Sequence, residues 1–144
     1  MAETVLRAEL AAAGLDGAVV VDSAGTGDWH VGDAMDPGAR AALARRGHDG
    51  SAHRARQFQP SWLRERDLIL AMDARNLADL RRMARETDAG RIRLFSEVGR
   101  LAETDISDPW GGGPDEFGHV LDLLGAAAPV IAARLARLLE PVAE

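Results

Sequence analysis

The stretch Asp67-Leu-Ile-Leu-Ala-Met-Asp73 places five apolar residues between two aspartates. So short and continuously apolar a run is typical of a β-strand that is covered on both faces of a sheet. The residues that follow, Asn76 to Arg85, carry apolar side chains at helical spacing, and Asp73 stands where an N-cap is expected. The chain is therefore expected to contain at least one strand that leads directly into a helix.

Two more runs of the same kind lie on either side of this unit. Ala18-Val-Val-Val-Asp22 comes before it and Arg91-Ile-Arg-Leu-Phe95 after it, and both are predicted to be strands. Helices are expected at residues 1–13, closed by Gly14, at residues 37–46 after the N-cap Asp36, and at residues 114–139 with an interruption near Gly125 and Pro129. Strands that alternate with helices predict an α/β fold, with a small parallel sheet between two layers of helices.

Composition limits the classes of protein to which the chain can belong. Its 144 residues form one predicted domain, 1–144, and 47% of them are apolar. The net charge is −6, which argues against nucleic acid as the main partner. No apolar run approaches the roughly 20 residues that span a bilayer, and no leader is recognised, so we expect a cytoplasmic protein without a membrane helix. Cysteine is absent, which excludes a thiolate nucleophile or thiolate metal site made from these residues.

The loop after the third predicted strand carries a candidate for acid catalysis. Asp108 precedes Pro109, and a residue before proline is held in an extended conformation. Glycines at positions 111–113 allow such a loop to lie close to a ligand. In parallel α/β sheets ligands bind beyond the carboxyl ends of the strands, where this loop is expected, and a carboxyl group there can protonate a leaving oxygen.

Six short motifs extend this candidate into a pattern that covers most of the chain. They occur in the order Asp22-Ser-Ala-Gly-Thr26, Asp28-Trp-His-Val-Gly32, Asp36-Pro-Gly-Ala-Arg40, His53-Arg-Ala-Arg-Gln57, Met72-Asp-Ala-Arg-Asn-Leu77 and Asp108-Pro-Trp110. Their identity, order and spacing resemble the low-molecular-weight protein tyrosine phosphatases. The resemblance implies a three-layer sandwich of the phosphotyrosine-phosphatase-I type, whose four parallel strands support hydrolysis of phosphotyrosine through a phosphocysteine, without metal or cofactor.

The resemblance also implies a role for particular residues. Asp108 corresponds to the general acid of the family. Ser23 and His53 correspond to residues that brace the phosphate-binding loop, and Trp29 and Trp110 occupy the places of the aromatic residues that wall the substrate cleft. The implied partner is a phosphotyrosine-containing protein or a small aromatic phosphate.

The chain departs from the family pattern at its beginning. The family starts with a strand and a Cys-x5-Arg loop, and a helix follows; Met1-Ala2-Glu3 stands where that helix begins. The first strand, the nucleophile and the loop arginine are therefore missing from the pattern, so this chain by itself is expected to be inactive.

Two interpretations of the departure stay open. In the first, the start of the chain was trimmed or misassigned, and the intact protein is an ordinary phosphatase. In the second, the chain is a cysteine-less pseudophosphatase that acts as a binding or regulatory module, or that supports chemistry independent of cysteine. Arsenate reduction, another activity of proteins with this fold, needs several cysteines, and the absence of cysteine argues against it.

A missing first strand has a structural consequence of its own. In the family it lies between the strands that resemble residues 18–22 and residues 67–72, so its loss leaves a gap one strand wide between two unpaired edges. We expect that the two strands pair directly, that a second chain covers the gap as in a homodimer, or that the protein is poorly stable.

Overall fold

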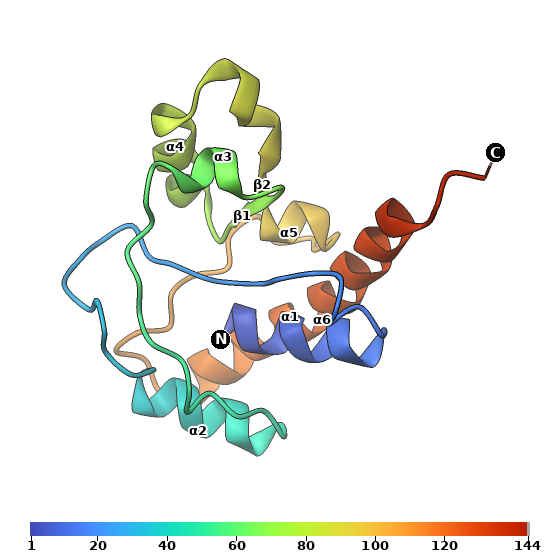
Figure 1. Ribbon diagram of the computed structural model, residues 1–144. Coiled ribbons are helices and arrows are strands. Elements are labelled where there is room, and N and C mark those ends of the chain that lie inside the picture. The colour runs from blue at the N-terminus through green and yellow to red at the C-terminus, as the bar shows by residue number, and fades with distance from the viewer. Residues whose placement is uncertain (144) are drawn as a thin grey trace.

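The centre of the molecule is a parallel pair of short strands. The computed structural model describes residues 1–143, and in it β1 (Ile69–Ala71) pairs with β2 (Ile92–Leu94), so that Ile69 lies opposite Ile92 (Figure 1). The predicted strands at residues 67–73 and 91–95 are confirmed, each in a shorter form. Ile92 is fully buried and Ala71 nearly so, as expected of strands that are covered on both faces.

The connection between the two strands is helical. α4 (Ala74–Met83) follows β1 directly, and the Asp73 carboxylate accepts a hydrogen bond from the backbone N–H of Asn76 at 2.7 Å. Asp73 is therefore the N-cap that the sequence predicts, although the helix begins two residues earlier than expected. The 3₁₀ helix η1 (Glu86–Arg91) leads from α4 into β2.

Two further helices confirm their sequence signals. α1 (Ala2–Ala12) is followed by Gly14 with φ 72°, a left-handed conformation that glycine adopts without steric cost. α2 (Pro37–Arg45) starts after Asp36, whose carboxylate accepts the backbone N–H of Gly38 at 2.8 Å. Both boundaries agree with the prediction to within one residue.

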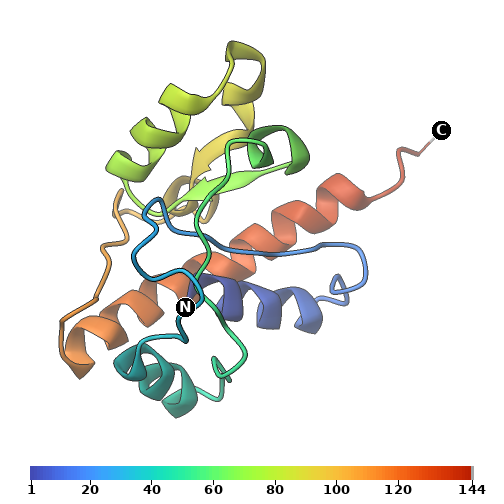
Figure 2. The ribbon, with the colours of Figure 1, turned by 60° about the vertical axis from the view of Figure 1, so that its left-hand side comes forward.

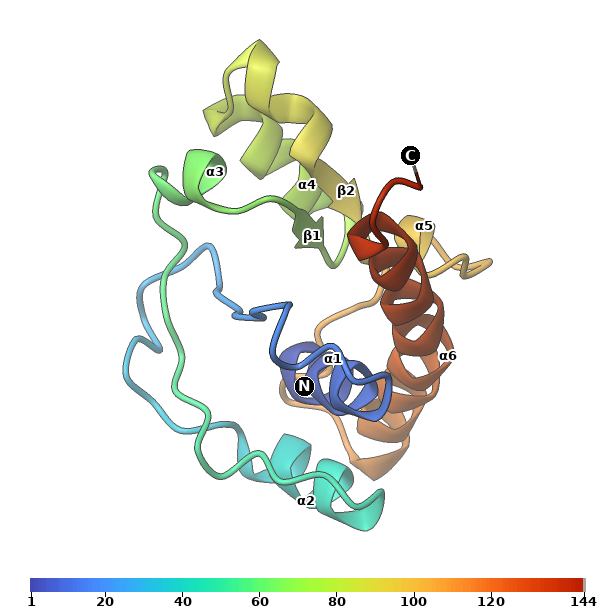
Figure 3. The ribbon, with the colours of Figure 1, turned by 45° about the vertical axis from the view of Figure 1, so that its right-hand side comes forward.

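The last helix corrects the prediction of an interruption. α6 (Pro114–Leu139) is one continuous helix of 26 residues with Pro129 inside it. Proline removes one backbone hydrogen bond, but the residues on either side are anchored, since Ala127, Ala128 and Ile131 are all buried in the core. By length and composition alone α6 could span a bilayer, contrary to the expectation of no such stretch; its apolar face, however, packs against α1 and α2 as a core helix does (Figure 3).

Helices lie on both sides of the strand pair. α1, α2 and α6 enclose the larger core on one side (Figures 1 and 2). On the other side α4 and the short α3 (Trp62–Glu65) pack with the strands around a smaller core of Leu63, Ile69, Ala71, Leu80 and Ile92. The short α5 (Phe95–Val98) follows β2 and contacts α6. The expected three-layer α/β arrangement is confirmed.

The predicted strand at residues 18–22 is wrong in this structure. Residues 19–24 have no regular secondary structure, and within residues 1–143 no strand pairs with them along their length. Val20 is 94% exposed. A strand needs a neighbour for its backbone N–H and C=O groups, and β1 is paired only with β2, so the two edges have not closed onto each other.

Candidate active site

Ser23 and His53, which the sequence pairs as bracing residues, meet at the first turn of α1. The Ser23 hydroxyl donates a hydrogen bond to Oε2 of Glu3, and Nδ1 of His53 lies 3.7 Å from the same oxygen. Glu3 also pairs with Arg7 at 2.9 Å, and its side chain is only 16% exposed. The structure thus brings the two predicted residues together through a carboxylate that the sequence analysis did not single out.

The charged groups at the start of α1 act on one another. Burial lowers the pKa of the Met1 α-amino group, and the carboxylates of Glu3 and Asp108 oppose that effect. Burial also lowers the pKa of His53, and the Met1 ammonium acts in the same direction, while Glu3 acts against it. Asp108 is therefore close enough to the start of α1 to act on it electrostatically.

The loop that carries Asp108 is anchored to the carboxyl end of β1. The backbone N–H of Ile106 donates to the carbonyl of Met72 at 2.8 Å, and the Asp105 carboxylate accepts the N–H of Ala74 at 2.9 Å. Asp108 itself is exposed, and its Oδ1 accepts the backbone N–H of Trp110 at 3.0 Å. The loop lies where the sequence predicts, at the strand end at which parallel sheets bind ligands.

Trp29 and Trp110 are both exposed, at 76% and 68%. They come from two different loops, and the ring of His30 lies between them, 6.4 Å from Trp29 and 6.1 Å from Trp110. The sequence analysis gave His30 no role, because nothing in its spacing connects it with a residue so far along the chain. The three rings form an exposed aromatic rim, Trp29–His30–Trp110.

A second cluster of side chains, around Asp22, was also not predicted from the sequence. The Asp22 carboxylate accepts hydrogen bonds from Arg66 at 2.6 Å and from Arg56 at 2.7 Å, and the Trp62 ring lies 4.7 Å from one guanidinium and 4.8 Å from the other. The hydrogen bond from Arg66 is the main cause that holds the pKa of Asp22 below its usual value. This cluster of contacts joins the unpaired segment that ends at Asp22 to the residues just before β1.

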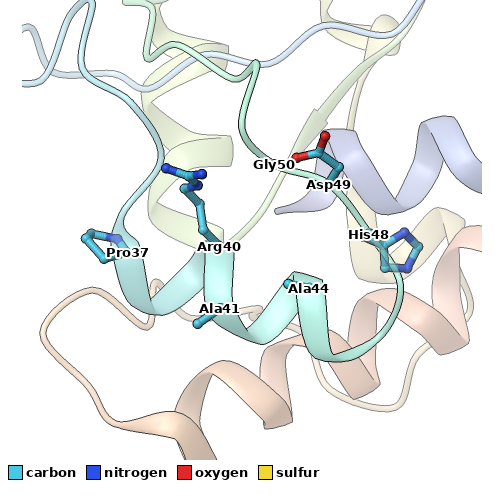
Figure 4. A pocket seen from close by; sticks show the side chains of 7 residues that line it. All are labelled: Pro37, Arg40, Ala41, Ala44, His48, Asp49 and Gly50. Carbon is cyan, nitrogen blue, oxygen red and sulfur yellow. The ribbon is translucent and has the colours of Figure 1, made fainter.

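The hollow drawn in Figure 4 is separate from these residues. It has a volume of about 320 Å³, lies against α2, and is lined by Pro37, Arg40, Ala41, Ala44, His48, Asp49 and Gly50 (Figure 4). It contains none of the five predicted site residues, and it is open to solvent. No group of three metal-ligating side chains occurs among residues 1–143.

Comparison with known proteins gives one consistent result. The family described as "Low molecular weight phosphotyrosine protein phosphatase" matches residues 1–140. A low molecular weight protein-tyrosine-phosphatase of Streptomyces coelicolor is 45% identical over 132 residues, which cover 89% of this chain and 80% of that protein. YfkJ of Bacillus subtilis is 37% identical over 125 residues, which cover 86% of this chain and 79% of YfkJ.

Solved structures agree with the sequence matches. The crystal structure of YfkJ superposes with a TM-score of 0.86 at 30% identity, over 96% of this chain and 87% of that one. A protein tyrosine phosphatase from Entamoeba histolytica, with Hepes in its active site, gives a TM-score of 0.89 at 27% identity, over 94% and 87% of the two chains. This chain belongs to the low molecular weight phosphotyrosine protein phosphatase family.

Proposed function

We propose that this chain supplies the substrate cleft and the general acid of a phosphatase that acts on phosphotyrosine or on small aromatic phosphates. The observation that carries the proposal is the convergence of Ser23 and His53 on Glu3 at the start of α1, together with the anchoring of the Asp108 loop at the carboxyl end of β1. The partial positive charge of a helix N-terminus favours a phosphate dianion at this place.

Each predicted residue has a task in this proposal. Asp108 gives its proton to the phenolic oxygen as the P–O bond breaks, so that a neutral phenol leaves while the phosphoryl group passes to a nucleophile that these 144 residues do not supply. Trp29 and Trp110 offer exposed indole faces against which the phenyl ring can pack. Ser23 and His53 hold the first turn of α1 in place through Glu3. No metal or cofactor enters these steps.

We further propose that the 144-residue polypeptide alone does not hydrolyse phosphotyrosine. Its sequence contains no cysteine, so it cannot form the phosphocysteine through which the family resemblance implies the reaction proceeds. With p-nitrophenyl phosphate and a phosphotyrosine peptide, the purified chain should match a heat-inactivated control. Turnover that survives repurification and falls in Asp108→Ala would contradict this and would require another nucleophile.

A binding module without catalysis is the second candidate, and the exposed rim of Trp29 and Trp110 favours it. Such a module acts in the cytoplasm and still binds an aromatic phosphate. Phenyl phosphate should then quench the tryptophan emission of the folded chain. No response at millimolar phenyl phosphate would remove this candidate.

We also propose that the chain pairs with a second copy of itself as a homodimer. Val20 is 94% exposed and β1 has β2 as its one paired neighbour within residues 1–143, so a second copy that covers this gap would remove an exposed apolar edge from water.

A further inference from the structure

One side chain connects the two loops that wall the candidate site. The ring of His30 meets Trp29 at 69° and Trp110 at 48°, with centroid distances of 6.4 and 6.1 Å. The other aromatic contact of the described residues, between Phe58 and Trp62, stays within a single segment. The loop around His30 and the loop that carries Asp108 are thus in contact through an imidazole.

The His30 side of this contact is held firmly. Nδ1 of His30 lies 3.3 Å from Oδ2 of Asp33, and the backbone carbonyl of Asp33 accepts the N–H of Ala55 at 2.9 Å. The N–H of Gly32 donates to the carbonyl of Ala55 at 2.8 Å. The backbone next to His30 is therefore hydrogen-bonded to the neighbouring segment.

Trp29 is placed by local packing. Its indole lies on Gly27 so closely that a Cβ atom at position 27 would overlap the ring. The absence of a side chain at Gly27 therefore sets where this indole can lie, and His30 meets it edge to face.

The hydrogen bonds at the tip of the Asp108 loop lie mainly within that loop. The backbone N–H of Trp110 donates to the Asp108 carboxylate, the backbone N–H of Gly112 donates to the carbonyl of Pro109 at 2.8 Å, and Gly111 adopts φ 80°. These hydrogen bonds shape the tip, but they do not attach it to the rest of the molecule.

We propose that His30 is a positioning residue of the candidate site: by packing against Trp110 it sets where the loop tip holds Asp108. The proposal rests on the proposed function for the meaning of Asp108, but the coupling between His30 and Trp110 can be measured without any substrate. The carboxylate recorded beside His30 is that of Asp33 on its own loop, and the ring that meets it from the facing loop is the Trp110 indole.

The chain has three tryptophans, and two conservative substitutions isolate one of them. In Trp29→Phe/Trp62→Phe only Trp110 emits, so its emission reports on the surroundings of the loop tip. Loss of the imidazole that packs against this indole should shift the emission maximum to longer wavelength in His30→Gln. His48→Gln, which makes the same change at the α2 hollow, should leave the emission maximum of the parent unchanged.

Access of a quencher to Trp110 tests the packing directly. Acrylamide should reach Trp110 more readily after His30→Gln than in the parent, and His30→Phe, which restores a ring, should bring protection back. An emission maximum that does not change in His30→Gln would overturn the proposal, as would a Phe variant no better protected than the Gln variant.

A measurement that keeps all three tryptophans guards against a tryptophan variant that fails to fold. With 5-fluorotryptophan incorporated, the ¹⁹F resonance of Trp110 should move in His30→Gln and return toward its parent position in His30→Phe. An unchanged resonance in His30→Gln would also overturn the proposal. Since no substrate is present, either result leaves the phosphatase proposal to be decided by its own assay.

Discussion

Asp108 and Trp110 are two residues apart, and one hydrogen bond joins the carboxylate of the first to the backbone N–H of the second. The proposed acid and one proposed wall of the cleft therefore move as one unit. At the first turn of α1, Glu3 joins Ser23 and His53 into a second unit. The chemistry of the site depends on how these two small units are held.

His53 gives a prediction about pH at this scale. Burial lowers its pKa in the folded protein, so the folded state binds fewer protons than the unfolded chain, whose histidines titrate near 6.5. The contribution of His53 to stability should therefore be fully present above pH 6.5 and decline as the pH falls through the depressed pKa. Urea unfolding at pH 7.5 and pH 5 measures it.

The control for this prediction is His53→Gln, which cannot acquire the charge. Its free energy of unfolding should fall less between the two pH values than that of the parent, while His119→Gln should behave as the parent does. Asp22 also has a lowered pKa, but its effect belongs to more acidic conditions, below the usual carboxyl range. Equal pH dependence in His53→Gln and the parent would show that His53 is not disfavoured as a cation in the fold.

Sequence reasoning found the residues that belong to motifs and missed those that are defined by contacts. Asp108 was predicted because a carboxyl group before proline, on a glycine-rich loop, has a local signature. His30 and Arg66 have none, since the ring that His30 meets and the carboxylate that Arg66 binds lie far away in the sequence. Only the folded arrangement identifies such partners.

At the scale of elements, helix ends were predicted well because capping is local. Asp36 and Asp73 both accept the backbone N–H groups that their positions imply. The strand predicted at residues 18–22 is wrong, because an apolar run indicates burial but says nothing about whether a neighbouring strand is there to pair with it. The continuity of α6 through Pro129 likewise depends on its packing and not on its propensity.

The cap of α4 supplies a prediction about an element. Asp73→Ala removes the acceptor for the N–H of Asn76 at the joint between β1 and α4, and it should lower the free energy of unfolding by about 1 kcal/mol. Thermal unfolding monitored by circular dichroism measures it, with Asp73→Asn as the control that keeps a capping oxygen. A loss as large in Asp73→Asn as in Asp73→Ala would mean that the charge of Asp73, and not its hydrogen bond, stabilises this joint.

For the whole molecule, the main feature is the open edge between β1 and residues 18–22. The hydrogen bonds from Arg66 to Asp22 join the two sides, but among residues 1–143 no strand pairing connects residues 18–22 with β1. An unpaired strand edge is a place at which a second chain can pair, and Val20 beside it is 94% exposed.

We therefore expect the purified 144-residue chain to dimerise, or to be poorly stable and aggregate. Sedimentation across a range of concentrations, together with chemical unfolding, decides the matter. Val20→Lys, which places a charge on the exposed edge, should shift a dimer toward monomer, and Val142→Lys, at another exposed valine, should not. A monomer that unfolds cooperatively with high stability would contradict this expectation.

The central claim is that this chain holds the cleft and the general acid of a phosphotyrosine phosphatase, and one chimera tests it most directly. The chain is joined behind a first strand and Cys-x5-Arg loop of the kind that the family resemblance implies, and hydrolysis of phenyl phosphate, whose phenol is a poor leaving group, is compared with and without Asp108→Ala. We predict turnover in the chimera and a fall of roughly 10²- to 10⁴-fold in the variant, smaller for p-nitrophenyl phosphate. A folded chimera without turnover, or a variant equal to its parent on phenyl phosphate, would contradict the claim.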